Sequence, residues 1–355
     1  MKLLYGIPSS PSFILGIPRS GTTWMSNIVE SAPSTTLFLE PFSTIGSDVL
    51  KPIPSTSTFL THGSHPLADY FRGEFLESLS SFKTLFRHSS NSNGRFKYER
   101  RICQALNFLC RKTPFNSPTR CRIFELLNLN RIPTDYRFYP KDEHAQHWII
   151  KELRAAGKTA PLIEAFPNSK FLTVMRHPCA TVDSILRWFE RGRLSEIRNE
   201  LRCFNDVLRS QVVGEKYLKL VDHVESSGSL PHQVALYWRV HYETIINSFI
   251  DNPNHMVVTL EELSINPTMK AKEVFKFFGI PWSTQVDEYI QYSTQTNQDE
   301  KNPVSTVRSA GSSYKDWCQQ IKPELRNSVE KVVFGSSLMT YFKPYYSSDL
   351  VADDS

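Results

Sequence analysis

Five short, mostly apolar runs are spaced along this chain, and helical patterns follow several of them. The runs cover residues 12–17, 36–39, 148–151, 170–175 and 255–260. Near-continuous apolar character over such short stretches is typical of strands that are buried on both faces of a parallel sheet. The runs therefore predict the strands of one parallel sheet.

Amphipathic stripes follow two of these runs. Met25, Ile28, Val29 and Ala32 lie at i, i+3, i+4 and i+7 and form one apolar face. Pro178 follows the fourth run at a favourable first helical position. This alternation predicts an α/β fold: a P-loop-type three-layer sandwich with about five parallel strands and helices on both faces. In such sheets, ligands bind at the carboxyl ends of the strands.

The stretch 51–147 differs from the rest because it is rich in Ser, Pro, Asn and Arg, with amphipathic pieces at 67–85 and 102–109. We interpret it as a mainly helical insertion, which is either a packing layer or a substrate lid. Residues 1–344 are expected to form a single domain. The polar tail 345–355 is expected to be flexible.

Composition narrows the class of protein. The chain has 355 residues, of which 40% are hydrophobic and 22% charged, as in an ordinary globular protein. A net charge of +5 suits an anionic ligand. Because the basic stretch from Arg187 to Arg202 is interleaved with Glu190, Glu196 and Glu200, no basic stripe points to nucleic acid.

Cysteine usage and the first strand bear on location. None of the six cysteines forms a Cys-x-x-Cys pair or a metal-ligand cluster, so we expect free thiols and no metal. A disulfide involving the group at 103, 110 and 121 stays open as an alternative. The first predicted strand starts near Ser12, which leaves no room for a signal peptide or membrane anchor. We therefore expect a cytoplasmic protein without a membrane partner.

The segment 16–21 follows the first strand and opens a helix. Its spacing matches the phosphate loop G-x-x-x-x-G-K-[ST] of nucleotide triphosphatases, but Thr22 replaces the lysine and the cation is Arg19. Glycines let successive N–H groups point at an anion, and the helix N-terminus adds partial positive charge. The missing lysine disfavours a P-loop kinase or nucleotidase, which stays an alternative together with a non-catalytic nucleotide-binding module.

The string Pro-Arg-Ser-Gly-Thr-Thr-Trp at 18–24 resembles the 5′-phosphosulfate loop of the sulfotransferase family, which uses 3′-phosphoadenosine 5′-phosphosulfate (PAPS). The resemblance implies that the 5′-phosphosulfate is held by Arg19, Ser20, Gly21, Thr22 and Thr23. It also implies that Trp24 lies near the adenine. Core packing on the first helix is the other interpretation of Trp24.

A second anion motif follows the fourth strand. Arg176, Pro178, Ser184 and Arg187 form the pattern Arg-x-Pro-x5-Ser-x2-Arg, which resembles the family's 3′-phosphate motif. The resemblance implies that Arg176 and Ser184 bind that phosphate. Arg308 lies where relatives place a further basic residue on the 3′-phosphate, although a solvated loop arginine is the alternative.

Sulfuryl transfer needs a cation on the leaving phosphate and a base for the acceptor proton. Arg19 is the candidate cation. Residues 150–154 lack the histidine base of cytosolic relatives and resemble the Lys-x-x-Arg segment of carbohydrate sulfotransferases, which also carry a Phe-Glu-Pro-type segment like residues 38–42. Glu40 is therefore the leading base candidate, a structural ion pair is its other interpretation, and Glu152 and His177 are reserves. The expected acceptor is a hydroxyl or amine of a small metabolite or saccharide.

Overall fold

The computed structural model describes residues 10–41, 65–76, 147–153, 155–189, 201–202, 204–206, 208–209, 212–295 and 321–345. Its centre is a sheet of five parallel strands in the order β2-β3-β1-β4-β5. The strands are β1 (Ser12–Leu15), β2 (Thr35–Leu39), β3 (His147–Glu152), β4 (Phe171–Met175) and β5 (His255–Thr259). The predicted fold class and all five predicted strands are confirmed.

Two predicted strands end earlier than the apolar pattern suggested. The first run continues to Ile17, but β1 ends at Leu15 because the loop after it turns back, with the Ser20 N–H donating to the Ile17 carbonyl at 3.3 Å. The fifth run continues to Leu260, but β5 ends at Thr259 because the Thr259 side chain caps the next helix.

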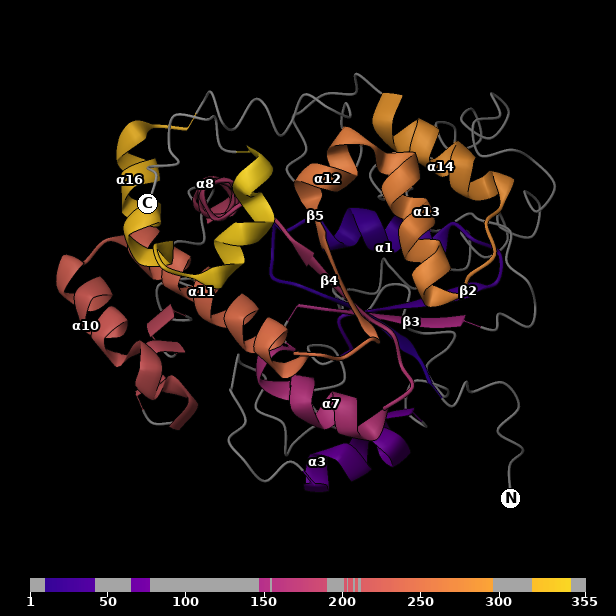
Figure 1. Cartoon of the computed structure of the whole chain (residues 1–355), viewed down its shortest axis with the longest axis horizontal. Helices are drawn as coiled ribbons and strands as arrows, with labels where there is room; N and C mark the ends of the chain where they lie inside the picture. Colours follow the sequence, from indigo (N-terminus) through magenta and orange to yellow (C-terminus); the bar gives the residue numbers. More distant parts are fainter. Residues whose placement is uncertain are drawn as a thin grey trace, which may run out of the picture.

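Alternating strand residues face two different cores. In β1, Ile14 packs with α1 (Thr22–Glu30), α13 (Pro267–Phe278) and α14 (Thr284–Gln295). Its neighbours Phe13 and Leu15 face the opposite core, which holds α7 (Thr159–Ala165), α8 (Pro178–Phe189), α11 (Leu230–Ser248) and α16 (Pro323–Val333). Figure 1 shows the strands between these two sets of helices. The sheet is therefore covered on both faces, and α8 begins at Pro178 as predicted.

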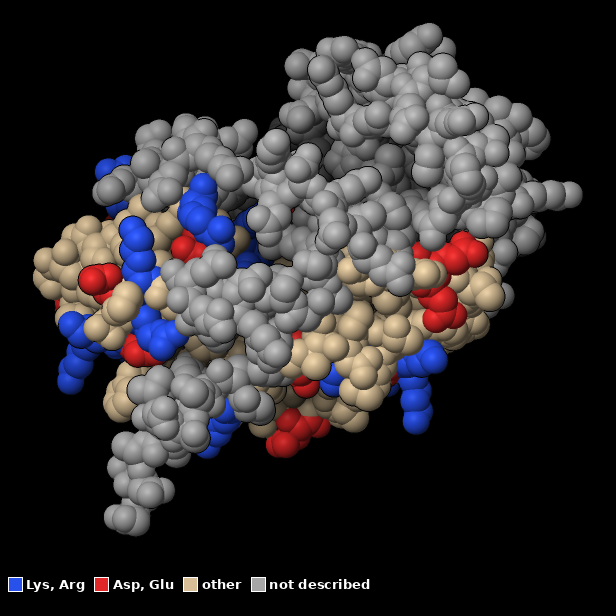
Figure 2. Space-filling view, turned by 90° about the horizontal axis from the view of Figure 1, so that it is seen from above, with Lys and Arg blue, Asp and Glu red and all other residues tan. Residues whose placement is uncertain are grey.

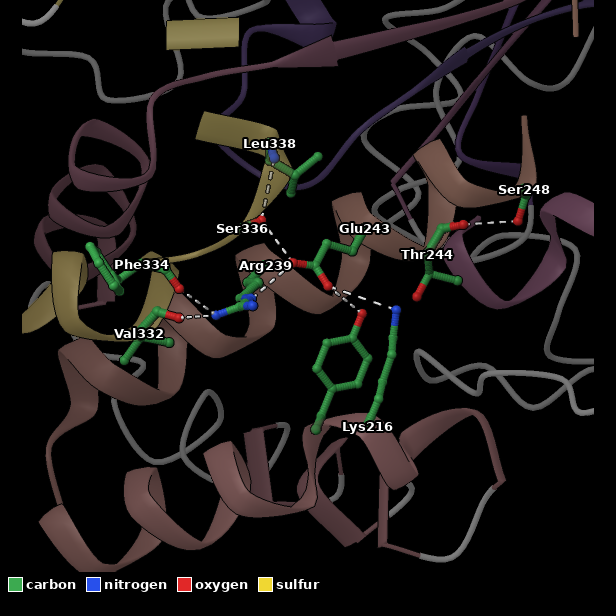
Figure 3. A network of polar contacts seen from close by, with 10 residues as sticks. Lys216, Arg239, Glu243, Thr244, Ser248, Val332, Phe334, Ser336 and Leu338 are labelled. Atoms are coloured by element: carbon green, nitrogen blue, oxygen red, sulfur yellow. Dashed lines mark hydrogen bonds and ion pairs between the residues drawn. The ribbon is translucent and has the colours of Figure 1, made fainter. Parts of the chain in front are cut away.

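The long helix α11 connects the sheet to the outer helices. Its Tyr242 hydroxyl donates to the Val174 carbonyl of β4 at 2.9 Å. On its other side, Glu243 bonds to groups from the 3₁₀ segment η5 (Val212–Tyr217), from Ser336 and from Arg239, as Figure 3 shows. Arg239 in turn donates to carbonyls at the end of α16. This network fixes the described C-terminal elements, α16 and the 3₁₀ segment η6 (Ser337–Tyr345), against α11. The helix α10 (Leu218–Ser227) precedes α11, and a short 3₁₀ segment η4 (Ala156–Lys158) precedes α7.

The structure describes one part of the predicted insertion. Helix α3 (His65–Tyr70) continues into a π-helical turn, η1 (Phe71–Phe75), in agreement with the predicted helical character there. Phe71 and Phe75 are fully buried in the core, and Arg72 donates to the Glu164 carbonyl of α7 at 3.1 Å. This part therefore packs against the core, and its function as a packing layer or a substrate lid stays a prediction. The remainder of the insertion, the tail beyond 345 and the cysteines at 103, 110 and 121 lie outside the described residues.

Charges of both signs are interspersed on one face of the described part of the molecule (Figure 2). On the face drawn in Figure 2, lysine and arginine side chains lie among aspartate and glutamate side chains. No helix in the described part of the chain is long and apolar enough to cross a membrane.

Candidate active site

The loop 16–21 forms a tight cradle at the carboxyl end of β1. A Cβ on Gly16 would lie 2.8 Å from the Val174 carbonyl oxygen, and a Cβ on Gly21 would lie 2.6 Å from a methyl carbon of Leu260. Gly21 also has a φ of +91°, which L side chains rarely adopt. Ser20 is fully buried and its hydroxyl donates to the Ile17 carbonyl at 2.7 Å. The predicted glycines are therefore required by the turn itself.

Helix α1 starts directly from this cradle. Gly21 occupies the N-cap, no side chain caps the helix, and its first turn contains no acidic residue. The first amides of a helix lack partners inside the helix, and the helix dipole makes this end partly positive. Thr22 and Thr23 stand in that first turn, as the sequence predicted. This terminus is therefore suited to an anion.

Arg19 connects the loop to the second predicted motif. Its Nε donates to the Ser184 Oγ of α8 at 3.0 Å, across 165 residues of sequence. Its φ is +70°, and in the described part of the chain only Glu40 and Asp251 are other non-glycine residues with positive φ. Such backbone strain is frequent at functional sites. Two of these three residues are the predicted catalytic pair.

Arg176 lies where β4 ends, beside this loop. Its Nη1 donates to the Arg19 carbonyl at 3.4 Å. Its own carbonyl accepts from Trp238 Nε1 at 3.0 Å and from Thr181 Oγ1 at 3.3 Å. Both Arg176 and Ser184 are buried. The structure thus brings together the two predicted anion motifs, which lie 157 residues apart.

Glu40 follows β2 at the same edge of the sheet. Its N–H donates to the Lys151 carbonyl at 2.7 Å, and its carboxylate forms an ion pair with the Lys151 ammonium. The Lys151 side chain is 3% exposed, whereas that of Glu40 is 33% exposed. The φ of Glu40 is +47°, so this residue also has a strained backbone. The pairing with lysine that the sequence left open is present, and solvent still reaches the carboxylate.

The two reserve bases are less accessible. Glu152 is fully buried and accepts the Leu153 N–H at 2.8 Å. Burial, followed by the charges of Arg326 and Arg176, lowers the pKa of His177 to about 3. Its Nδ1 also accepts the Cys179 N–H at 3.3 Å. A buried imidazole of such low basicity is poorly suited to general-base catalysis.

Trp24 lies on the opposite face of the sheet from α8. Its indole Nε1 donates to the Ser293 hydroxyl of α14 at 3.1 Å, and Ser293 is fully buried. The ring is half-buried beside the core of α1, α13 and α14. Nothing in the sequence pointed to Ser293, because α14 is remote along the chain.

Glu261 lies beside the Arg176 turn. It is 1% exposed, and its Oε1 accepts the His177 N–H at 3.1 Å. Burial raises the pKa of Glu261 to about 7, although the nearby Arg176 charge opposes that shift. The sequence places two glutamates side by side here. Glu262 completes the capping box with Thr259, so the first glutamate, Glu261, has no part in the cap.

Arg308 lies outside the described residues, so its role stays a prediction. Among the residues that the structure describes, no group of three or more His, Cys, Asp or Glu side chains could hold a metal ion.

Comparison with known proteins identifies the family of this chain. The model of the Sulfotransferase family matches residues 11–284, which is most of the chain. The chain therefore belongs to the sulfotransferase family of enzymes.

Individual relatives are distant. Carbohydrate sulfotransferase 3 of Mus musculus is 33% identical over 63 residues, which are 18% of this chain and 13% of the relative. Carbohydrate sulfotransferase 1 of Mus musculus is 34% identical over 64 residues, 18% of this chain and 16% of the relative. The matched stretch thus spans less than a fifth of these relatives.

Among solved structures, the sulfotransferase domain from the curacin biosynthetic pathway aligns with a TM-score of 0.44 and 14% identity, covering 95% of this chain and 99% of that one. The sulfotransferase STF9 from Mycobacterium avium aligns with a TM-score of 0.42 and 12% identity, covering 95% and 77%.

Proposed function

We propose that this enzyme transfers the sulfuryl group of PAPS to a hydroxyl or amino group of a small metabolite or saccharide. The observation that carries the proposal is the junction of the two anion motifs, where Arg19 bonds to Ser184 and Arg176 bonds to the Arg19 carbonyl. A ligand with anionic groups on two separate ribose positions fits two such adjacent motifs. A triphosphate presents its phosphates in one row and also needs the lysine that Thr22 replaces.

The residues fit the proposed cofactor. The glycine cradle and the uncapped start of α1 suit the 5′-phosphosulfate, which would be held by Arg19, Ser20, Gly21, Thr22 and Thr23. Arg176 and Ser184 would hold the 3′-phosphate, with Arg308 as a further proposed contact. Trp24 would lie near the adenine.

The bound cofactor supplies an activated sulfuryl group and leaves as 3′,5′-adenosine bisphosphate. Sulfuryl transfer resembles phosphoryl transfer in that positioning and charge stabilisation dominate. Arg19 and the N-terminus of α1 would stabilise the negative charge that develops on the leaving phosphate. Both groups come from one short segment, so their relative position is fixed by the turn of the loop.

Glu40 would accept the proton of the acceptor hydroxyl or amine on its carboxylate. Three features support this role: the carboxyl edge of the sheet, the positive φ and the partial exposure. The strands β1 and β2 are separated by β3, so Arg19 and Glu40 follow strands about 10 Å apart. The buried Lys151 would orient the carboxylate through the ion pair.

A saccharide is the first acceptor class to test. The similar carbohydrate sulfotransferases support a saccharide. A screen of saccharides and small alcohols and amines with labelled PAPS would identify the acceptor.

The proposed chemistry is tested by following labelled sulfate in variants of the two central residues. We expect Arg19→Ala to abolish turnover. We expect Glu40→Gln to lower kcat by roughly 100-fold or more while cofactor affinity stays within about threefold, because a base acts only on the transferred proton. Arg209→Ala is the matched control, since Arg209 is a surface arginine paired with Asp222 and Glu225.

Three outcomes would overturn parts of this proposal. Near-normal turnover of Glu40→Gln, with Arg19→Ala inactive, would leave Glu40 as a structural partner of Lys151 only. Cofactor binding without transfer to any acceptor would favour a non-catalytic binding module. Magnesium-dependent ATP binding in place of PAPS binding would favour a P-loop kinase.

A further inference from the structure

Glu261 is a buried acid, and a contribution to stability alone does not explain its position. It lies in the first turn of α12 (Leu260–Ile265), next to the carboxyl ends of β4 and β5. Of its two carboxyl oxygens, Oε1 accepts the His177 N–H at 3.1 Å, and Oε2 is buried without a hydrogen-bond partner among the described residues. A buried oxygen without a partner destabilises a fold, so such a group calls for an explanation.

The neighbouring Glu262 shows that α12 does not need Glu261 for its start. The Glu262 carboxylate accepts from the Thr259 N–H at 2.9 Å and from the Thr259 hydroxyl at 3.0 Å. It also pairs with Lys270 at 3.4 Å. The cap of α12 is therefore complete without Glu261, whose hydrogen bond goes to a different loop.

That bond acts on one particular peptide unit. The peptide bond between Arg176 and His177 has its carbonyl held by Trp238 and Thr181 and its N–H held by Glu261. Because a peptide unit is planar, bonds to both of its polar atoms fix the orientation of the plane. The plane in turn sets the direction in which the Arg176 side chain leaves the backbone.

We propose that Glu261 is a positioning residue for the 3′-phosphate of the cofactor, acting through the peptide plane between Arg176 and His177. The inference rests on the proposed function, because that function assigns the 3′-phosphate to Arg176. Glu261 itself would not touch the phosphate. Its acceptor oxygen is the active feature, so an amide of the same size should replace the carboxyl.

The test compares two nucleotides that differ only in the 3′-phosphate. The affinities of adenosine 3′,5′-bisphosphate and adenosine 5′-monophosphate are measured by titration calorimetry for each variant, and their ratio is the readout. We expect Glu261→Ala to reduce the wild-type ratio by about tenfold, and Glu261→Gln to keep it within about threefold of wild type. The matched control is Glu262→Ala, which removes a carboxylate from the same helical turn and should leave the ratio unchanged.

A loss of stability alone would not change this ratio, because both nucleotides bind the same folded protein. A wild-type ratio in Glu261→Ala would overturn the proposal. If that variant does not fold, Glu261→Asp serves instead, since it keeps the charge but withdraws the acceptor. A lowered ratio in Glu261→Asp with a normal ratio in Glu261→Gln supports the proposal, and the reverse pattern contradicts it. Failure of the proposed function would be seen separately, as a wild-type protein that binds neither nucleotide or does not distinguish them.

Discussion

Glu243 in α11 and Glu261 at the start of α12 are both largely removed from solvent, and their surroundings are opposite. Glu243 accepts from Ser336 and Tyr217 at 2.7 Å each and from Arg239 at 2.9 Å (Figure 3). Burial alone would raise the pKa of Glu243, but these hydrogen bonds and the Arg239 charge lower it overall. Glu261 accepts the His177 N–H, and burial raises its pKa to about 7.

The difference separates a stabilising site from the proposed binding site. The Glu243 network ties helices together and leaves both carboxylate oxygens occupied. The Glu261 carboxyl lies at the carboxyl edge of the sheet, where the predicted anion motifs meet, and its Oε2 has no hydrogen-bond partner in the described part of the chain. Of these two glutamates, the one far from that edge has both carboxylate oxygens hydrogen-bonded, and the one at the edge lies beside the Arg176 turn.

The largest expected effect on stability comes from disrupting the hydrogen-bond network around Glu243. Glu243→Ala removes the acceptor of three donors, including the mostly buried Arg239, and should lower the free energy of unfolding by roughly 3–5 kcal/mol. Urea denaturation measures this loss. Asp222→Ala is the control, because its surface ion pair with Arg209 should contribute only about 0–1 kcal/mol. A loss below about 1 kcal/mol in Glu243→Ala would show that the network is not stabilising.

The pH dependence of stability should have opposite signs at the two glutamates. Because the folded pKa of Glu261 is raised, the folded protein holds a proton that the unfolded chain releases between pH 4.5 and about 7. The contribution of Glu261 to stability therefore falls as pH rises through that window. We expect the free energy of unfolding of Glu261→Gln, relative to that of wild type, to rise by up to about 3 kcal/mol between pH 4.5 and 8. Urea denaturation at several pH values measures this change.

Glu243→Gln provides the counterpart. Its folded pKa is lowered, so Glu243 contributes stability above its ordinary pKa of 4.5, and this contribution is lost as pH falls. The stability deficit of Glu243→Gln relative to wild type should therefore be smallest at low pH. If the stability differences of both variants were independent of pH, the contrast between the two carboxyls would be absent.

The smallest expected effect concerns Trp24, on the other face of the sheet. Ser293→Ala removes the acceptor of the indole N–H and should lower stability by about 1 kcal/mol. We also expect affinity for adenosine 3′,5′-bisphosphate to fall by about threefold, since Trp24 would be less firmly held near the adenine. Calorimetry and urea denaturation measure the two effects. Reduced stability with unchanged affinity would favour core packing as the role of Trp24.

Thr294→Val is the matched control for this change. Its hydroxyl bonds within α14, to the carbonyls of Ile290 and Gln291. Loss of this hydroxyl should change stability by no more than a few tenths of a kcal/mol. Nucleotide affinity should stay unchanged.

The sequence predicted the sheet well because buried parallel strands have a strong local signature. The five apolar runs, the start of α8 at Pro178 and the glycine loop all depend on residues adjacent in the chain. Strand ends were less accurate, because the cap at Thr259 competes with an apolar pattern that continues to Leu260. The family resemblance named residues at both anion motifs.

Contacts between distant segments could not be predicted in the same way. The bond from Arg19 to Ser184, the hydrogen bond of Trp24 to Ser293 and the role of Glu261 depend on how loops meet after folding. The positive φ values of Arg19 and Glu40 are also a property of the folded loops, because neither residue type favours them. Composition and periodicity carry no information on such contacts.

The central claim is that one ligand with both a 5′- and a 3′-anionic group occupies the edge where Arg19 and Arg176 meet. Titration calorimetry with adenosine 3′,5′-bisphosphate tests it most directly, without a known acceptor. The account predicts metal-independent binding at least about tenfold tighter than that of adenosine 5′-monophosphate, and loss of this preference in Arg176→Ala. Undetectable binding at about 1 mM bisphosphate, or an unchanged preference in Arg176→Ala, would contradict it.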